Sequence, residues 1–238
     1  MKKILACVPT FNESGNIKIL CKKILRIKKI DLLIIDDNSP DNTWAIVENL
    51  RLKNKNLFLI KRKKKIGIGS AIRAGFDFAL KKKYDAIITL DADLSHDPEK
   101  IPLFINKLKQ NDFVIGSRYI KDGKSDYKGI RDFLSRSANI LCNFFLKMPF
   151  KEFTTSYRIY SNKSLKTLSK FNLKTEDYSS QIEFFFYIYY SGLKCNEIPI
   201  MFKDRSKGNS KIPKLQIIYT FLKLIKLSIK KIFLTKKK

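Results

Sequence analysis

Few of the residues that build metal sites and catalytic triads occur in this sequence. The single histidine, His96, excludes a site with several histidines and leaves one candidate for a histidine-based triad. No C-x-x-C pair is present, and each cysteine lies among apolar residues, which favours reduced structural thiols in a reducing compartment. The cysteines are Cys7, Cys21, Cys142 and Cys195.

Acidic residues are also scarce. The chain has 22 Asp and Glu against 49 Lys and Arg, a formal charge of +27. This excess favours anionic partners: nucleic acid, phosphorylated ligands or an acidic membrane face. A general bias towards Lys, Ile and Asn explains much of the lysine, so the positions where the few carboxylates cluster are more informative.

Long apolar runs and the common nucleotide motifs are absent as well. No uncharged window approaches the roughly 20 residues that span a bilayer, and the run Ile4–Val8 is too short for a signal peptide. Glycines at Gly67, Gly69 and Gly75 miss the dinucleotide fingerprint, because Ile72 stands where it needs glycine, and there is no P-loop. This turn suits either a close approach to a nucleotide or tight packing against a helix.

The first half of the 238 residues alternates short apolar strands with helices, which predicts an α/β fold with a mostly parallel sheet covered on both faces. Ligands bind such sheets beyond the carboxyl ends of the strands. The expected strands are Ile4–Val8, Leu32–Ile35, Leu57–Ile60, Ala86–Leu90 and Phe113–Gly116. The expected helices are Ile17–Ile27, Thr43–Leu50, Ser70–Leu80 and Glu99–Leu108.

The second half has a different pattern. We expect an amphipathic helix, a shorter helix, an aromatic helix, a strand and then a basic loop: Arg131–Leu146, Lys163–Ser169, Gln181–Tyr190, Cys195–Phe202 and Lys203–Lys211. Residues 215–234 form a tail with apolar residues at helical spacing and several lysines. One domain followed by a tail is therefore the expected organisation.

Two carboxylates, Asp91 and Asp93, follow the fourth expected strand. On an extended segment they point to the same side, where they would repel each other without a cation. Mg²⁺ or Mn²⁺ bridged to a diphosphate resolves this, which predicts a nucleotide diphosphate and most simply a nucleotide sugar. The alternative is a pair of loop carboxylates, one of them capping the helix near Pro98. For His96 we favour a supporting or packing role over metal ligation.

A second acidic pair, Asp36 and Asp37, ends the second expected strand. A carboxylate there can accept hydrogen bonds from a base or ribose, whereas the following Asn-Ser-Pro-Asp segment also needs a turn-stabilising residue. We expect one aspartate to serve the ligand and the other to serve the loop.

Five basic residues stand out from the lysine background: Arg118, Arg131, Arg158, Arg205 and Lys211. A guanidinium matches phosphate oxygens well. We favour phosphate binding over a surface ion pair for Arg118, Arg205 and Lys211, whereas Arg158 can instead form a buried pair with Glu152 or Glu183.

Several segments carry a resemblance to a known family. They are Pro9–Glu13, Asp36–Asp41, Gly67–Ala71, Asp91–His96, Gly116–Tyr119, Ser135–Asn139, Thr154–Tyr160, Gln181 with Glu183, and Asp204-Arg205 followed by Gly208–Lys211. In this order, over nearly the whole chain to about residue 211, they resemble the family 2 inverting glycosyltransferases, and within them the dolichyl-phosphate (polyprenyl-phosphate) mannosyltransferases.

The resemblance implies a GT-A fold, a GDP-mannose donor, a polyprenyl phosphate acceptor and Mg²⁺ or Mn²⁺. It places the nucleoside at Pro9, Phe11, Glu13, Ile35 and Asp37. It places the diphosphate and metal at Asp91, Ala92, Asp93 and Ser95, with phosphate contacts from Arg118, Arg205 and Lys211. Three departures are Phe11 in place of a frequent Tyr, Glu152 in place of a usual Asp, and the absence of the family's frequent transmembrane helices.

On this basis residues 1–211 form the catalytic domain and residues 212–238 an amphipathic tail. The tail suits the plane of an anionic membrane, which predicts a peripheral enzyme at the cytoplasmic face; a helix docked on the core or on a small membrane partner protein is the alternative. Asp93, Arg118 and Arg131 are the expected catalytic residues. Because the acceptor phosphate is already anionic, catalysis would rest on positioning and charge stabilisation.

Two rival readings remain open. One is the same fold with another donor, such as UDP-glucose. Another is a saccharide acceptor, which needs a base carboxylate, for which Glu152 is the candidate. Nucleic-acid binding, suggested by the charge alone, is not expected, because the aromatic residues concentrate in one helix and the tail instead of alternating with basic residues on one face.

Overall fold

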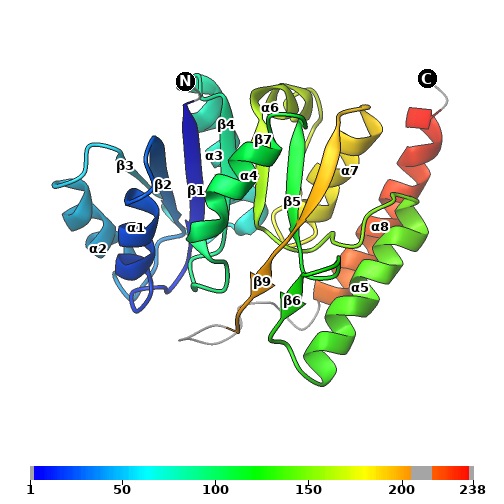
Figure 1. Ribbon diagram of the computed structural model, residues 1–238, viewed down its shortest axis with the longest axis horizontal. Helices are drawn as coiled ribbons and strands as arrows, with labels where there is room; N and C mark the ends of the chain where they lie inside the picture. Colours follow the sequence, from blue (N-terminus) through cyan, green and yellow to red (C-terminus); the bar gives the residue numbers. More distant parts are fainter. Residues whose placement is uncertain (1–2, 205–215, 236–238) are drawn as a thin grey trace.

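A seven-stranded sheet forms the centre of the protein (Figure 1), whose computed structural model describes residues 3–204 and 216–235. The strand order is β3-β2-β1-β4-β7-β5-β8. The strands are β1 Ile4–Thr10, β2 Ile30–Asp36, β3 Leu57–Lys61, β4 Ala86–Thr89, β5 Phe113–Ser117, β7 Arg158–Ser161 and β8 Cys195–Pro199. The predicted mostly parallel α/β sheet is confirmed.

One strand that we did not expect, β7, lies antiparallel between β4 and β5. It is only four residues long and directly follows a polar segment, so it gives almost no periodic signal. Its direction has a consequence for the site. Because β7 begins at the edge where β4 and β5 end, the residues just before Arg158 lie beside the ends of both strands.

Helices cover both faces of this sheet. On one side lie α1 Ile17–Leu25, α2 Thr43–Arg51 and α4 Ile101–Lys107, which follows the 3-10 turn Pro98–Lys100. Their buried residues share one apolar cluster with alternate residues of β1 such as Ala6 and Val8. On the other side α3 Ile68–Lys81 packs on β1, and α6 Asn162–Leu168 and α7 Ser180–Tyr190 continue the same apolar cluster, which contains Leu5 and Cys7. The continuous apolar strands are therefore buried on both faces, as their composition predicted.

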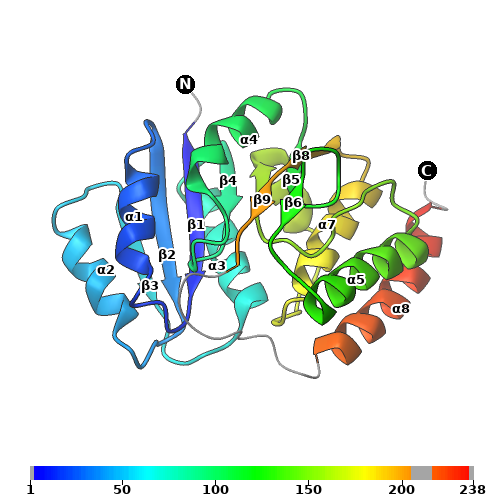
Figure 2. The same ribbon diagram turned by 60° about the horizontal axis from the view of Figure 1, so that its bottom comes forward.

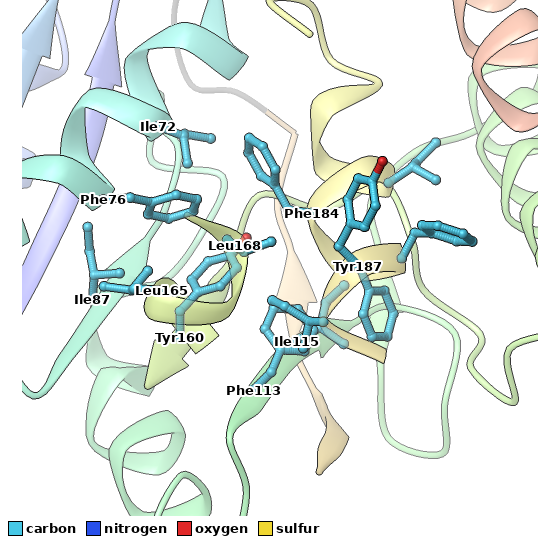
Figure 3. Close-up of a cluster of buried hydrophobic side chains, with 14 of the residues drawn as sticks. Ile72, Phe76, Ile87, Phe113, Ile115, Tyr160, Leu165, Leu168, Phe184 and Tyr187 are labelled. Atoms are coloured by element: carbon cyan, nitrogen blue, oxygen red, sulfur yellow. The ribbon is translucent and has the colours of Figure 1, made fainter. Parts of the chain in front are cut away.

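The aromatic helix α7 fills the core beneath the second half of the sheet (Figure 3). Phe184 lies against Phe76 of α3, and Tyr160 of β7 contacts both Phe76 and Phe113 with ring centroids 4.9 and 5.0 Å apart. The aromatic residues Phe184–Tyr187 of this helix are therefore buried and stabilise the core, whereas Tyr189 and Tyr190 at its end are partly exposed.

Beyond the sheet, the expected strand Cys195–Phe202 is divided in two. β8 ends at Pro199, and β9 (Met201–Phe202) pairs with β6 (Lys124–Ser125), which we did not expect. The break occurs because Ile200 changes partners: its N–H donates to Ser117 of β5, while its carbonyl accepts from Lys124 of β6.

Two long helices, α5 Ile130–Leu146 and α8 Gln216–Thr235, lie side by side at one end of the molecule (Figures 1 and 2). Both helices were expected within one or two residues of their observed ends. Within residues 3–204 and 216–235, no helix combines the length and apolarity needed to cross a bilayer. The four cysteines are all free, three of them buried, and burial raises the pKa of the Cys7 thiol to about 12.

Arg158 is a structural residue of this core. Its side chain is fully buried and donates hydrogen bonds to the carbonyls of Thr155 (2.6 Å), Phe153 (2.6 Å) and Gln181, so the expected pair with Glu152 or Glu183 is replaced by backbone partners. These contacts join β7, the segment before it and the start of α7.

We predict that Arg158→Ala lowers the free energy of unfolding by about 4 kcal/mol, because three buried carbonyls lose a charged donor. Arg51→Ala is the matched control, since its ion pair with Glu48 is exposed and contributes under about 1 kcal/mol. Urea denaturation measures both values. Equal midpoints for the two variants would contradict this role.

Candidate functional site

Asp36 fastens the end of β2 to its neighbours. The buried carboxylate accepts hydrogen bonds from the Thr10 hydroxyl (2.8 Å) and from the backbone N–H (2.8 Å) and hydroxyl (2.6 Å) of Ser39. It therefore holds the ends of β1 and β2 together, and it is the loop-stabilising member of the acidic pair that we expected.

Asp37 is also engaged by the protein. One of its oxygens accepts from the N–H groups of Ile66 (3.2 Å) and Gly67 (3.1 Å), and the other pairs with Arg62. These contacts fix the turn that leads into α3. Only 6% of Asp37 is exposed, so little of it is accessible to a ligand. Its role in nucleoside binding stays a prediction.

The glycine-rich turn serves tight packing within the protein. Gly67 has φ +127°, and a Cβ there or at Gly69 would overlap the carbonyls of Glu176 and Thr175. Gly69 also donates its N–H to Glu176 (2.8 Å). Of the two alternatives for this turn, contact with another protein segment is the one that the structure shows.

The other predicted nucleoside residues differ in accessibility. Pro9 and Phe11 are partly exposed at the end of β1, and the Lys65 ammonium lies 4.1 Å from the Phe11 ring centre. Glu13 is buried and accepts from the Asn16 amide at 2.9 Å. The Ile35 side chain is fully enclosed in the core, so it has no surface to offer a ligand.

The segment Asp91–His96 forms a tight turn just beyond β4. Asp91 accepts from the Ser156 hydroxyl, and 34% of its side chain is exposed. Asp93 accepts from the Ser95 N–H (3.1 Å), and Leu94 between them has φ +64°. The helix cap near Pro98 comes from Asp97, whose carboxylate accepts from the Glu99 N–H (3.0 Å), so neither Asp91 nor Asp93 is needed for capping.

His96 supports this turn from inside the protein. The Asp91 N–H donates to Nδ1 (3.2 Å), so Nε2 carries the proton and donates to the Thr155 hydroxyl (3.2 Å). Burial lowers the pKa of His96, although Asp91 and Asp93 act in the opposite direction, and the ring packs against Tyr157 and Phe202. The expected packing role is confirmed, and both ring nitrogens are hydrogen-bonded to protein partners.

The oxygen atoms of this turn fit a divalent cation that also binds a diphosphate. Asp91 and Asp93 flank the buried Ala92, and the Ser95 hydroxyl is buried without a hydrogen-bond partner in the described ranges. No group of three or more His, Cys, Asp or Glu residues assembles a cage among the described residues. Mg²⁺ and Mn²⁺ suit such a partial set of hard ligands, because substrate phosphates complete it.

Arg118, just past β5, forms a buried bidentate pair with Glu152. Nε lies 2.8 Å from one carboxylate oxygen, Nη2 lies 2.9 Å from the other, and Nη2 also donates to the Thr154 hydroxyl (2.8 Å). Burial opposes the charge of Arg118, but Glu152 outweighs it and raises the pKa of the guanidinium. Nη1 has no hydrogen-bond partner among the described residues.

Glu152 is saturated with donors. Besides Arg118, it accepts from the N–H groups of Thr154 (3.0 Å) and Thr155 (3.2 Å) and from the Thr154 hydroxyl (3.0 Å). Burial alone would raise its pKa, but the charge and hydrogen bonds of Arg118, together with Thr154, hold it below the usual range. The side chain has no exposed surface, so it is poorly suited to take a proton from a substrate.

Arg131 lies in the first turn of α5 and is about half exposed. It pairs with Asp204 (2.9 Å), and its guanidinium lies 4.6 Å from the Tyr127 ring centre. Arg205 and Lys211 lie outside the described residues. Sequence reasoning missed the roles of Thr154 and Ser156, although the segment that contains them was among those carrying the family resemblance.

The chain matches the glycosyl transferase family 2 domain over residues 6–169. It is 30% identical to polyprenol monophosphomannose synthase of Mycolicibacterium smegmatis over 215 residues, which are 89% of this chain and 81% of that protein. It is 28% identical to undecaprenyl-phosphate mannosyltransferase of Micrococcus luteus, covering 88% of this chain and 87% of that protein.

Solved glycosyltransferases share the fold. The mannosyltransferase PcManGT of Pyrobaculum calidifontis, solved with GDP-Man and Mn²⁺, superposes with a TM-score of 0.59 at 15% identity, covering 97% of this chain and 74% of that one. TarS of S. aureus gives 0.60 at 16% identity, covering 95% and 39%. These neighbours confirm the predicted GT-A fold. The chain belongs to glycosyltransferase family 2 and is a glycosyltransferase.

Proposed function

We propose that this enzyme transfers mannose from GDP-mannose to a polyprenyl phosphate, with inversion at the anomeric carbon. The observation that carries the choice of acceptor is the engagement of Glu152 by Arg118 and the 154–155 backbone. A hydroxyl acceptor needs a base, and the candidate carboxylate is buried with its lone pairs occupied. A phosphate acceptor needs none. The names of both curated relatives agree with this acceptor.

On the donor side, Asp91, Asp93 and Ser95 would hold Mg²⁺ or Mn²⁺. The bound cation would neutralise charge on the departing diphosphate. Ser156 holds the Asp91 carboxylate and His96 holds its backbone N–H. Asp91 would therefore be positioned as a metal ligand before the donor binds. Pro9, Phe11, Glu13 and the backbone around Asp37 would bind the nucleoside. The mannosyltransferase neighbour solved with GDP-Man and Mn²⁺ supports this assignment.

On the acceptor side, Arg118 and Arg131 would hold the phosphate for attack on the anomeric carbon from the face opposite the leaving group. Glu152 fixes two of the three nitrogens of Arg118, which would leave Nη1 to bind the phosphate. Arg205 and Lys211 would close over the donor phosphates and exclude water.

A lipid acceptor places the enzyme at a membrane. We infer peripheral binding at the cytoplasmic face through the tail of residues 212–238, which includes α8. A small membrane partner protein that covers α8 is the alternative occupant.

A donor panel tests the function. We expect radiolabel from GDP-mannose, and none from UDP-glucose or UDP-GlcNAc, to enter the organic phase with polyprenyl phosphate. Transfer from UDP-glucose instead would support the rival donor. Label that stays in the aqueous phase with a saccharide acceptor would overturn the lipid assignment.

We predict that Asp93→Asn lowers turnover by about a hundredfold, because losing one anionic ligand removes on the order of 3 kcal/mol of charge stabilisation in the transition state. Manganese-dependent GDP binding, measured by calorimetry, should fall in parallel. The matched control is Asp97→Asn, which changes a capping carboxylate in the same turn. Near-normal turnover in folded Asp93→Asn would refute the metal assignment.

We predict that Glu152→Gln raises the KM for polyprenyl phosphate by about tenfold, because an amide cannot accept both Arg118 donors and the guanidinium loses its fixed direction. Glu152→Asp should restore part of the affinity. A catalytic base would behave differently: its loss would abolish turnover at every acceptor concentration and remove a limb of the pH–rate profile. Rates across the pH range separate the two roles.

A further inference from the structure

α5 and α8 present apolar side chains to solvent over much of their length. The outward residues on α5 include Phe133, Ile140 and Phe144, each more than 60% exposed. On α8 the exposed apolar positions recur at helical spacing: Ile218, Phe221, Ile225, Ile229 and Ile232. We call this combined surface the α5–α8 face.

The two helices are in direct contact, so the face is continuous. Ser228 and Lys231 of α8 both donate to the Phe145 carbonyl of α5, at 3.3 and 3.1 Å, and the Phe145 and Phe221 rings pack with centroids 5.8 Å apart. Figures 1 and 2 show the pair along one end of the molecule. α5 lies within the expected catalytic domain, so the apolar surface extends beyond the tail.

A cleft of about 680 Å³ runs along one edge of this face, between α8 and residues 172–179. Its lysines come from both sides: Lys223, Lys226 and Lys230 at i, i+3 and i+7 on α8, and Lys174 opposite. Lys223 donates to Thr175 and to Glu183 (3.2 Å), which ties α8 to the wall of the cleft.

The charge balance of the cleft favours an anion. Four lysines and three carboxylates line it, which leaves one net positive charge: Glu183 is paired with Lys223, Asp177 accepts from Ser179 and Gln216, and Glu176 is exposed. Lys174 and Lys226 are exposed and form no ion pair with any described residue. α8 itself contains no acidic residue.

We propose that this cleft binds the phosphate headgroup of an anionic phospholipid while the α5–α8 face lies in the bilayer interface. An apolar stripe bordered by lysines has the chemistry of that interface, with acyl chains beside phosphates. A second copy of this chain would bring like charges together, because it carries the same lysines. The inference deepens the proposed membrane association and rests on it.

Vesicle sedimentation tests the headgroup site. The double variant Lys174→Gln/Lys226→Gln is compared with Lys53→Gln/Lys55→Gln, which removes the same charge from exposed positions between α2 and β3, at the far end of the sheet. At about fivefold per lysine, we expect the cleft variant to bind phosphatidylglycerol-containing vesicles about 25-fold more weakly than the control. Equal affinities would overturn the site.

Two further measurements separate the possible outcomes. Ile140→Ser/Phe144→Ser should weaken binding to phosphatidylcholine and to mixed vesicles alike, relative to the exposed control Leu52→Ser; unchanged binding would remove α5 from the face. A change from dimer to monomer in the same variant would instead assign the face to a second copy.

Turnover with a detergent-solubilised acceptor distinguishes this proposal from the proposed function. The cleft variant should retain full mannosyl transfer in detergent. Loss of transfer there would place the lysines in the reaction and overturn the headgroup site. If the parent enzyme shows no transfer while the vesicle result holds, the proposed function fails and the lipid site stands.

Discussion

A buried positive charge needs a fixed partner. For Arg118, at the carboxyl ends of the strands, this partner is Glu152. In an apolar setting the two charges are expensive to separate, so the guanidinium keeps one direction and one protonation state. Much of the surrounding structure serves this pair. Arg118 directly follows β5. Because β7 is antiparallel to β5, the segment before β7, which contains Glu152 and Thr154, lies beside the same end of β5.

The same reversal links the two halves of the site. Ser156 and Thr155, which precede β7, reach Asp91 and His96 beyond β4, while Glu152 and Thr154 reach Arg118 beyond β5. One short segment therefore contacts Asp91, His96 and Arg118 and holds them in fixed positions. Because β7 is antiparallel to β4 and β5, the residues before it lie at the carboxyl ends of both strands. There they hold the negative charge of Asp91 and the positive charge of Arg118 in fixed positions.

Most of the parallel strands and the helices could be predicted from the sequence, because they depend on local patterns. Continuous apolar strands such as Leu32–Ile35 predict double-sided burial, and helical spacing predicts α5 and α8. β7 and β6 escaped prediction because two to four residues carry no period. The partner of Arg158 could not be predicted either: a carboxylate is the obvious choice, but the fold supplies three carbonyls, and only the tertiary structure brings them together.

The close fit at the glycine turn has a mechanical consequence. Gly67 and Gly69 leave no space beside the carbonyls of Glu176 and Thr175, and Arg73 is hydrogen-bonded to the same segment. Lys223 of α8 contacts Thr175 from the other side. The start of α3 and α8 therefore pack on opposite sides of the same short segment, residues 175–176. Neither helix can shift along this segment without displacing the other.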